Sequence, residues 1–242
     1  MIKLSVNINK IATVRNSRGG GVPSVLEAAA VCLQSGAPGV TVHPRADARH
    51  ITTRDVRDVS AVVTAWPSAA EFNIEGDPRP ELLELVHEVR PTQCTLVPVI
   101  PGEVTSQAGW RKETAGNVPQ VVRDLRDAGI RVSLFVEPDS DAIRWAAETG
   151  ADRVELYTEP FARAFEAGDG QAAFGVYADA AALAHRLGLG INAGHDLDLE
   201  NLVLFRRLPH LDEVSIGHAL ISRAIFEGLD RTVREYLEVL SR

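Results

Sequence analysis

The sequence predicts an α/β fold, a TIM (β/α)8 barrel in which outer helices surround eight parallel strands. Short β-rich runs alternate with amphipathic stretches eight times along the chain, the order that produces parallel strands joined by crossover helices. Five of these runs finish in a side chain able to move a proton or bind an oxyanion, as strands do at the mouth of such a barrel. The length of 242 residues, with no linker-like stretch, suits a single barrel domain over residues 1–242.

The expected strands are short apolar runs. In chain order they cover residues 3–8, 39–43, 70–75, 94–98, 131–136, 152–157, 189–193 and 212–216. All parallel strands of a barrel aim their carboxyl ends at one mouth, so polar residues that are distant in sequence meet there.

The amphipathic stretches between these runs predict helices over residues 23–36, 52–65, 79–89, 117–128, 139–149, 171–187, 198–207 and 219–240. Asp139 and Asp198 are suited to begin two of them, because a short side-chain oxygen accepts a free amide hydrogen at a helix start. Glycines able to adopt the left-handed conformation that ends a helix stand at Gly36, Gly129, Gly150 and Gly188.

Two connections, residues 99–116 and 158–170, are longer than a barrel needs. Connections of this length in a compact fold are typical of lids and binding loops. We expect the first to close over a bound substrate.

The composition indicates a globular, water-soluble chain. Hydrophobic residues make up 45% and charged residues 24%, and the net charge of −8 argues against a nucleic-acid surface. There is no signal-like start and no apolar run long enough to span a membrane, so we expect a cytoplasmic protein without membrane partners. Cys32 and Cys94 lack partners at ligand spacing, so neither a disulfide nor a zinc site is expected.

The first strand runs into a polar segment that contains Asn7, Asn9, Lys10 and Arg18. Strand alternation would place Asn7 and Asn9 on one face, and the planar fork of Arg18 is suited to phosphate oxygens. A polar strand end followed by a glycine turn explains the same residues equally well, so this segment alone supports both interpretations.

His43, Arg45, Arg49 and His50 follow the second strand within one short loop. Imidazole titrates near neutral pH and acts as acid or base, while arginines hold anionic groups beside it. His50 taken alone is better explained as a surface residue, but the combination favours a functional loop.

Glu75 and Glu155 end or lie within apolar strands. Burial disfavours the charged carboxylate and raises its pKa toward a value useful for a base. A salt bridge with an arginine at the rim is the structural alternative for Glu75, and orientation of a neighbouring histidine is an alternative for Glu155.

The ends of the last two strands predict a phosphate site. His195 and Asp196 follow Gly194, and His218 follows Gly217. Small residues there let backbone amides approach a ligand, and the loops after strands seven and eight are the recurrent phosphate site of these barrels. His195 is suited to proton transfer, whereas His218 has the simpler alternative of starting the last helix.

Several chemistries are disfavoured. Lysine occurs only at Lys3, Lys10 and Lys112, which makes a strand-borne imine improbable. There is no compact His and carboxylate ligand set and no dinucleotide-binding glycine motif in the right context, so we expect neither a metal nor an organic cofactor. Acid–base chemistry on a phosphorylated carbonyl compound is the remaining prediction.

The chain resembles the pyridoxine 5′-phosphate synthases of the deoxyxylulose-dependent vitamin B6 pathway. The matching segments extend from the first strand to the last helix. They are residues 6–8 (VNI), 11–19 (IATVRNSRG), 39–45 (GVTVHPR), 49–52 (RHIT), 96–98 (LVP), 192–195 (NAGH) and 216–219 (IGHA).

This resemblance implies condensation of 1-deoxy-D-xylulose 5-phosphate with 3-amino-2-oxopropyl phosphate, releasing phosphate and water without a cofactor. It implies that His43 and Glu75 accept protons, that His195 donates one, and that Glu155 stabilises charge or positions water. The implied contacts to the aminoketone phosphate are Asn7, Arg18, Gly217 and His218, and those to the pentulose phosphate are Arg45, His50 and Thr105. The family also implies a homo-octamer.

Two positions depart from the family pattern while remaining in the expected substrate-binding set. Asn9-Lys10 stands where the family has Asp-His, and Asp196 stands where it has glycine. We expect the charges of Lys10 and Asp196 to offset one another near the mouth. Two other classes are consistent with the residues: a cofactor-free isomerase or lyase acting on one sugar phosphate, and a non-catalytic phosphosugar-binding relative.

Overall fold

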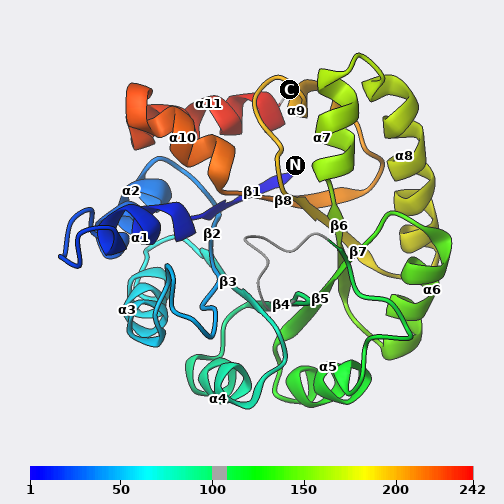
Figure 1. Cartoon of the computed structure of the whole chain (residues 1–242), viewed down its shortest axis with the longest axis horizontal. Helices are drawn as coiled ribbons and strands as arrows, with labels where there is room; N and C mark the ends of the chain where they lie inside the picture. The colour runs from blue at the N-terminus through cyan, green and yellow to red at the C-terminus, as the bar shows by residue number, and fades with distance from the viewer. Residues whose placement is uncertain (100–107, 242) are drawn as a thin grey trace.

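Eight parallel strands close into a barrel at the centre of the molecule (Figure 1). The computed structural model describes residues 1–99 and 108–241. Each strand pairs with its neighbours in sequence and β8 pairs with β1, which confirms the TIM barrel. The strands are β1 (Lys3–Asn7), β2 (Gly39–Val42), β3 (Glu71–Gly76), β4 (Gln93–Leu96), β5 (Arg131–Val136), β6 (Arg153–Tyr157), β7 (Gly190–Gly194) and β8 (Leu211–Ile216).

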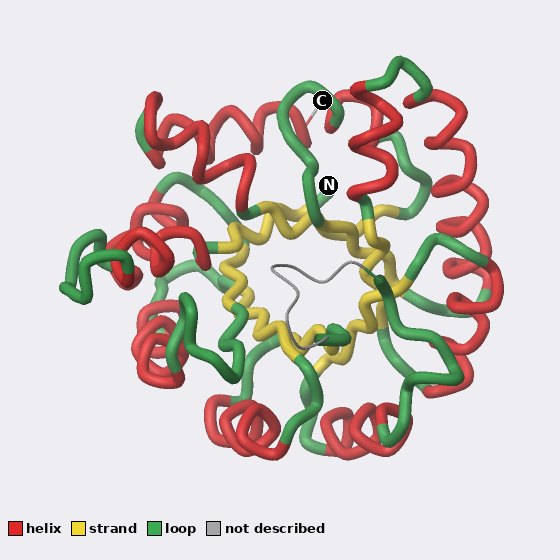
Figure 2. The backbone as a smooth tube through the Cα atoms, viewed as in Figure 1, coloured by secondary structure: helices red, strands yellow, loops and turns green. Residues whose placement is uncertain are grey.

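Helices surround this barrel on the outside (Figure 2). They are α1 (Asn9–Asn16), α2 (Val25–Gln34), α3 (Thr53–Thr64), α4 (Pro80–Val89), α5 (Val118–Asp127), α6 (Ser140–Thr149), α7 (Glu159–Glu166), α8 (Gly170–Arg186), α9 (Leu202–Phe205), α10 (His218–Glu227) and α11 (Leu229–Ser241). The apolar side chains of the strands, such as Leu4, Val40 and Ile74, are fully buried in one core with the helices.

The alternate side chains of the strands form a polar network across the barrel. Ser5 and Thr41 share a hydrogen bond of 2.6 Å, Asn73 donates to Thr41 at 3.3 Å, and Thr95 donates to Asn73 at 3.0 Å. These buried groups serve as hydrogen-bond partners for one another, as buried polar atoms normally require. Glu75 lies two residues beyond Asn73 and therefore on the same face of β3, one layer nearer the mouth.

The opposite, amino-terminal end of the barrel holds its own charged groups in ion pairs. Glu71 pairs with both Lys3 and Arg131, and Arg153 Nη1 lies 3.6 Å from Glu213 Oε2. The arginine charges inside the barrel are therefore neutralised far from the mouth. The carboxylates at the mouth face no such partner among the described ion pairs.

The predicted helix boundaries were wrong in three places. Asn9–Asn16 form α1, a helix that was not predicted, and the Asn7 side chain accepts the Asn9 amide at 3.1 Å where it begins. The expected long connection over 158–170 contains α7. The expected last helix is divided into α10 and α11 at Gly228, whose φ of +84° is incompatible with a continuous helix.

The helix-end predictions had mixed outcomes. Asp139 accepts the amides of Asp141 and Ala142 and caps α6, as expected. Asp198 accepts amides in a turn, but α9 begins only at Leu202. The glycines predicted to end helices all have positive φ, at Gly36, Gly129, Gly150 and Gly188.

The expectation that connection 99–116 closes over substrate concerns residues 100–107, which include Thr105 and lie outside the described residues. The following segment is anchored by Trp110, whose Nε1 donates to the carbonyl of Leu96 at 2.9 Å and whose amide donates to Phe135 at 2.8 Å. No helix in the described part of the chain is long and apolar enough to cross a membrane.

Candidate active site

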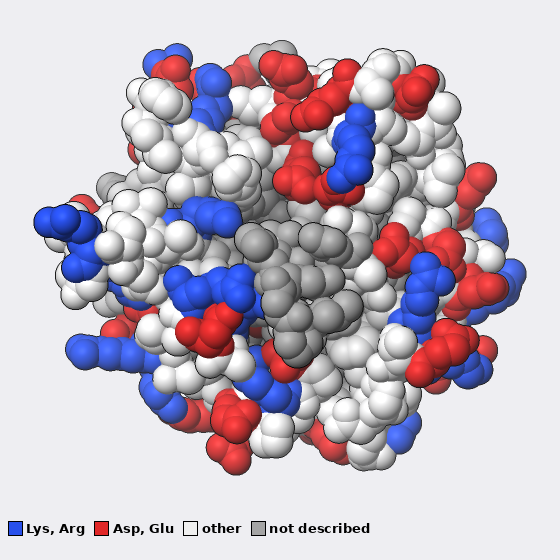
Figure 3. Space-filling view, viewed as in Figure 1, with Lys and Arg blue, Asp and Glu red and all other residues white. Residues whose placement is uncertain are grey.

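A cavity of about 430 Å³ opens at the carboxyl ends of the strands. It is lined by Asn7, Asn9, Lys10, Thr13, His43, Arg45, Arg49, His50, Glu75, Val97, Glu155, His195, Asp196, Leu197, Ser215, Ile216, Gly217, His218 and Ala219. On this face, Figure 3 shows basic side chains over the ends of β1 and β2 and acidic side chains near the start of α7. Twelve of the fourteen predicted site residues line the cavity; Arg18 does not, and Thr105 lies outside the described residues.

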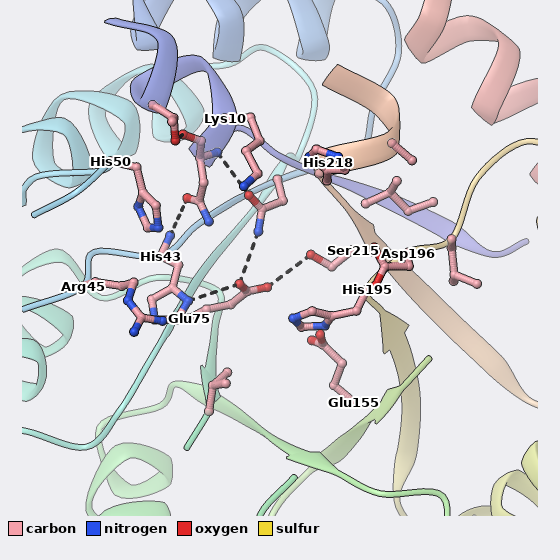
Figure 4. Close-up of a pocket in the computed structure, with 18 of the residues that line it drawn as sticks. Lys10, His43, Arg45, His50, Glu75, Glu155, His195, Asp196, Ser215 and His218 are labelled. Atoms are coloured by element: carbon pink, nitrogen blue, oxygen red, sulfur yellow. Dashed lines mark hydrogen bonds and ion pairs between the residues drawn. The ribbon is translucent and has the colours of Figure 1, made fainter. Parts of the chain in front are cut away.

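Glu75 is the most highly connected carboxylate of the cavity (Figure 4). Its Oε2 accepts from Asn7 Nδ2 at 3.2 Å, and its Oε1 accepts from Ser215 Oγ at 3.2 Å. His43 Nδ1 lies 3.9 Å from Oε2. The expected alternative, a salt bridge from Glu75 to an arginine at the rim, is absent from the ion pairs of the described residues.

The pKa of Glu75 is raised to about 7, mainly by burial; the hydrogen bond from Ser215 opposes this rise and the charge of Glu213 adds to it. The residue is only 5% exposed, so solvent screens these influences weakly. A carboxyl group with a pKa near 7 can both accept and return a proton at neutral pH.

A chain of hydrogen bonds links Glu75 to the backbone of His43. The Asn7 side chain, which donates to Glu75, accepts the Asn9 amide at 3.1 Å through its Oδ1. Asn9 Oδ1 in turn accepts the His43 amide at 2.9 Å. The turn between β1 and α1 therefore fixes the positions of both His43 and Glu75.

His43 is buried and neutral at ordinary pH. Burial lowers its pKa well below the usual value, and the charges of His50, Arg45, Arg79 and His195 lower it further. Its Nε2 is buried without a hydrogen-bond partner among the described residues. A neutral imidazole with an unoccupied nitrogen can accept a proton. We call Asn7, Asn9, His43, Glu75 and Ser215 the bonded side of the cavity.

His195 occupies a strained turn after β7. Its φ is +81° and that of Asp196 is +56°, two successive left-handed residues that are not glycine. The buried Thr158 hydroxyl contacts the carbonyl oxygens of both Gly194 and His195, the latter at 2.5 Å. Thr158 therefore holds the strained turn from the end of β6.

The His195 ring packs between aromatic rings, with centroids 4.8 Å from Phe135 and 5.6 Å from Tyr157. Burial lowers the pKa of His195, and the neighbouring Asp196 charge partly opposes this. The imidazole is neutral in this environment and keeps one N–H to donate. Its Nδ1 is buried without a partner in the described part of the chain.

Glu155 lies beside His195 on β6 (Figure 4). Burial, followed by the charges of Glu75 and Glu213, raises the pKa of Glu155 well above its usual value. Its Oε2 also lacks a partner within the described residues. A Cβ at Gly194 would lie 2.8 Å from Glu155 Oε1, so only glycine leaves room for this carboxyl group. We call Glu155 and His195 the open side of the cavity.

Cationic groups occupy the rim near β2. Lys10, Arg45 and His50 all line the cavity, and Arg79 Nη2 supports their loop by donating to the Pro44 carbonyl at 2.6 Å. His50 Nδ1 accepts the Ile51 amide at 2.9 Å. Burial and the charges of Arg45 and Lys10 lower the pKa of His50 to about 4, so this histidine serves as a neutral donor or acceptor.

The end of β8 has the features expected of an anion site. Gly217 precedes α10, and His218 is its first residue, as the simpler interpretation of His218 required. A Cβ at Gly217 would lie 3.1 Å from the Asn7 side chain, so a larger residue would press against Asn7. The free amides at the start of a ten-residue helix favour phosphate oxygens.

Three sequence-based expectations are not supported by contacts among the described residues. Arg18 lies in the exposed turn after α1 and does not line the cavity. Thr105 is outside the described residues. Lys10 and Asp196 both line the cavity, but no ion pair of the described residues joins them, so their mutual offset stays a prediction.

Sequence reasoning missed Thr13 and Ser215 as lining residues. Thr13 was missed because α1 was not predicted. Ser215 stands two residues before Gly217, so alternation along β8 was the signal that could have found it. Among the described residues, no group of three or more His, Cys, Asp or Glu side chains could hold a metal ion.

The fold and the cavity together define a barrel protein whose mouth places buried carboxyl and imidazole groups beside cationic side chains. The chain belongs to the family described as pyridoxal phosphate biosynthesis protein PdxJ, whose model matches residues 4–242. A pyridoxine 5′-phosphate synthase of Porphyromonas gingivalis is 52% identical over 245 residues and covers 100% of both chains. One of Leptospira biflexa is 48% identical, covering 100% of this chain and 98% of its own.

Solved structures with low sequence identity share the fold. Phosphoribosylanthranilate isomerase of Thermotoga maritima superposes with a TM-score of 0.61 at 14% identity, covering 100% of this chain and 99% of its own. Thiamine phosphate pyrophosphorylase of Pyrococcus furiosus gives 0.62 at 10% identity, with coverages of 99% and 96%. At these identities the likeness extends to the barrel alone.

Proposed function

We propose that this chain is a pyridoxine 5′-phosphate synthase. It condenses 1-deoxy-D-xylulose 5-phosphate with 3-amino-2-oxopropyl phosphate and releases pyridoxine 5′-phosphate, inorganic phosphate and water. The observation that carries the proposal is the convergence of His43, Glu75, Glu155 and His195 on one cavity of a chain about half identical to named synthases. The reaction is a transferase-class condensation without a cofactor.

The chemistry requires several proton transfers on successive intermediates, because an imine forms, water and phosphate leave, and a ring closes. Glu75 and His43 remove protons from carbon and from the attacking amine on the bonded side. His195 donates protons to leaving oxygens on the open side, and Glu155 stabilises charge or holds a water molecule beside it. Because four side chains share the proton transfers, different steps of the reaction can use different acids and bases.

Substrate binding follows from the charges of the rim. The aminoketone phosphate contacts Asn7 at the end of β1 and Gly217 and His218 at the start of α10. Arg18 would reach this phosphate only after movement of the turn that follows α1. The pentulose phosphate contacts Arg45, His50 and Thr105, and the cationic Lys10 adds attraction for its phosphate. Holding both partners in one cavity removes much of the entropic barrier to a bimolecular step. Octameric assembly and a cytoplasmic location complete this proposal.

A reconstitution experiment tests the proposal. The purified protein is mixed with both phosphorylated substrates, and pyridine absorbance and released phosphate are followed together. We expect both signals to appear in equal amounts only when both substrates are present.

Three outcomes separate the proposal from the other classes. Turnover of a single sugar phosphate would indicate an isomerase or lyase. Saturable binding of both substrates without product would indicate a non-catalytic relative. Product formation that is unchanged in Glu75→Gln would contradict the assigned role of that carboxylate.

A further inference from the structure

Ser215 contacts the central carboxylate of the site, yet no role follows for it from the reaction described above. It lies on β8 between Glu213 and Gly217, and these three alternate residues share one face of the strand. The side chain is 5% exposed, and its Oγ donates to Glu75 Oε1 at 3.2 Å. A buried hydroxyl that donates to Glu75 is well placed to fix the orientation of its carboxylate.

The two oxygens of Glu75 have different surroundings. Oε1 accepts the hydrogen bond of Ser215, whereas Oε2 accepts from Asn7 and lies 3.9 Å from His43 Nδ1 (Figure 4). The Ser215 contact comes from β8 and the other two come from the ends of β1 and β2. Rotation of the carboxyl group would therefore break contacts to residues of three adjacent strand ends.

We propose that Ser215 is a positioning residue, which fixes the Glu75 carboxylate with Oε2 toward His43 and keeps it in the ionised form that accepts a proton. This inference rests on the proposed function for its catalytic consequence. The hydrogen bond itself is a property of the folded chain and does not depend on the identity of the substrate.

The groups around Glu75 determine how strongly the Ser215 hydrogen bond affects the ionisation of its carboxyl group. The titratable groups around this carboxyl group are His43, Glu155, Glu213 and Cys94. His43 is neutral, and so is the Cys94 thiol, whose pKa burial raises to about 12, so neither group offsets the negative charge of Glu213. Burial and Glu213 both raise the pKa of Glu75, and the hydroxyl of Ser215 opposes them.

The test compares Ser215→Ala with two controls. Ser215→Thr keeps the hydroxyl. Ser133→Ala removes another fully buried hydroxyl of the barrel, one that has no hydrogen-bond partner among the described residues. The dependence of kcat/KM on pH is measured for all three and for the unaltered chain.

Loss of a hydrogen bond to a charged group should move the acidic limb in Ser215→Ala upward by about one pH unit. At about pH 7 the rate should fall about five-fold, because the ionised fraction of Glu75 falls from roughly one half to about a tenth. Ser215→Thr and Ser133→Ala should keep the original limb.

A direct titration separates this inference from the proposed function. The carboxyl NMR signal of isotopically labelled Glu75, assigned by its loss in Glu75→Gln, is followed against pH. Its midpoint should rise in Ser215→Ala even if the unaltered chain makes no product. An unchanged midpoint, or an equal rise in Ser133→Ala, would overturn the inference. If Ser215→Ala fails to fold, Ser215→Cys takes its place, because the thiol is a weaker donor and should also raise the midpoint.

Discussion

The bonded side of the cavity holds Glu75 and the His43 backbone in a chain of hydrogen bonds and leaves His43 Nε2 without a partner among the described residues. The open side has no such chain, and buried atoms of both Glu155 and His195 lack partners there. Buried polar atoms normally have partners, so the atoms on the open side are where the hydrogen-bonding groups of a ligand are expected. The bonded side is oriented by the protein before a ligand arrives.

The two sides also differ in how the backbone is held. On the bonded side the turn between β1 and α1 is fixed by Asn7 and Asn9. On the open side the strained His195 turn is fixed by Thr158. Strain at a functional position persists only where the surroundings enforce it, so the open side should depend most on a residue outside the cavity lining.

The largest expected effect comes from Glu75→Gln on the bonded side. The amide cannot accept the proton, so kcat should fall about 10³-fold while KM changes little. Steady-state kinetics with both substrates measure the effect, and circular dichroism verifies the fold. A loss confined to KM would show that Glu75 binds substrate without moving protons.

Thr158→Val should affect the open side next most strongly. Removal of the hydroxyl lets the His195 turn relax, and displacement of a catalytic group by about 1 Å costs roughly 100-fold in kcat. Thr158→Ser retains the hydroxyl and serves as the control. If Thr158→Val and Thr158→Ser have equal kcat, the backbone contact does not position His195.

Asn9→Ala tests the hydrogen-bond chain of the bonded side. The His43 amide loses its acceptor, and we expect about a ten-fold loss in kcat from the displaced imidazole. Asn9→Asp keeps an acceptor oxygen and should retain most of the activity. Equal losses in both variants would indicate that Asn9 acts on substrate through its amide group.

The last effect should appear in stability and not in turnover. The pKa of Glu75 is raised from 4.5 to about 7 by folding, so its stabilising contribution is full below pH 4.5 and is lost as the pH rises through about 7. Relative to Glu75→Gln, the unaltered chain should lose about 2.5 kcal/mol in free energy of unfolding between about pH 5 and about pH 8. Chemical denaturation of both proteins at several pH values measures this difference, and parallel curves would contradict the raised pKa.

Much of the site was predictable because strand order and alternation determine which residues reach the mouth. His43, Glu75, Glu155 and His195 come from four separate segments and line one cavity, as the barrel prediction requires. The hydrogen bonds that surround these four residues were not predictable from the sequence. Asn9 was expected to share a face with Asn7 by strand alternation, but it is the first residue of α1, and its side chain accepts the His43 amide.

Other features escaped prediction because they depend on contacts between distant strands. Ser215 carries no motif and gains its role only from Glu75, which lies 140 residues earlier. The left-handed conformation of His195 and Asp196 is uncommon for residues other than glycine, and Thr158 contacts the turn that contains it.

The sequence by itself determined the barrel, the face to which each strand residue belongs, and the acid–base character of the mouth, because these depend on local periodicity and on residue type. Only the tertiary structure decided which oxygen of Glu75 faces His43, which histidine nitrogens are unpartnered among the described residues, and how far burial shifts each pKa. Those properties arise from distances of a few ångströms between segments far apart in the chain, and sequence spacing does not encode such distances.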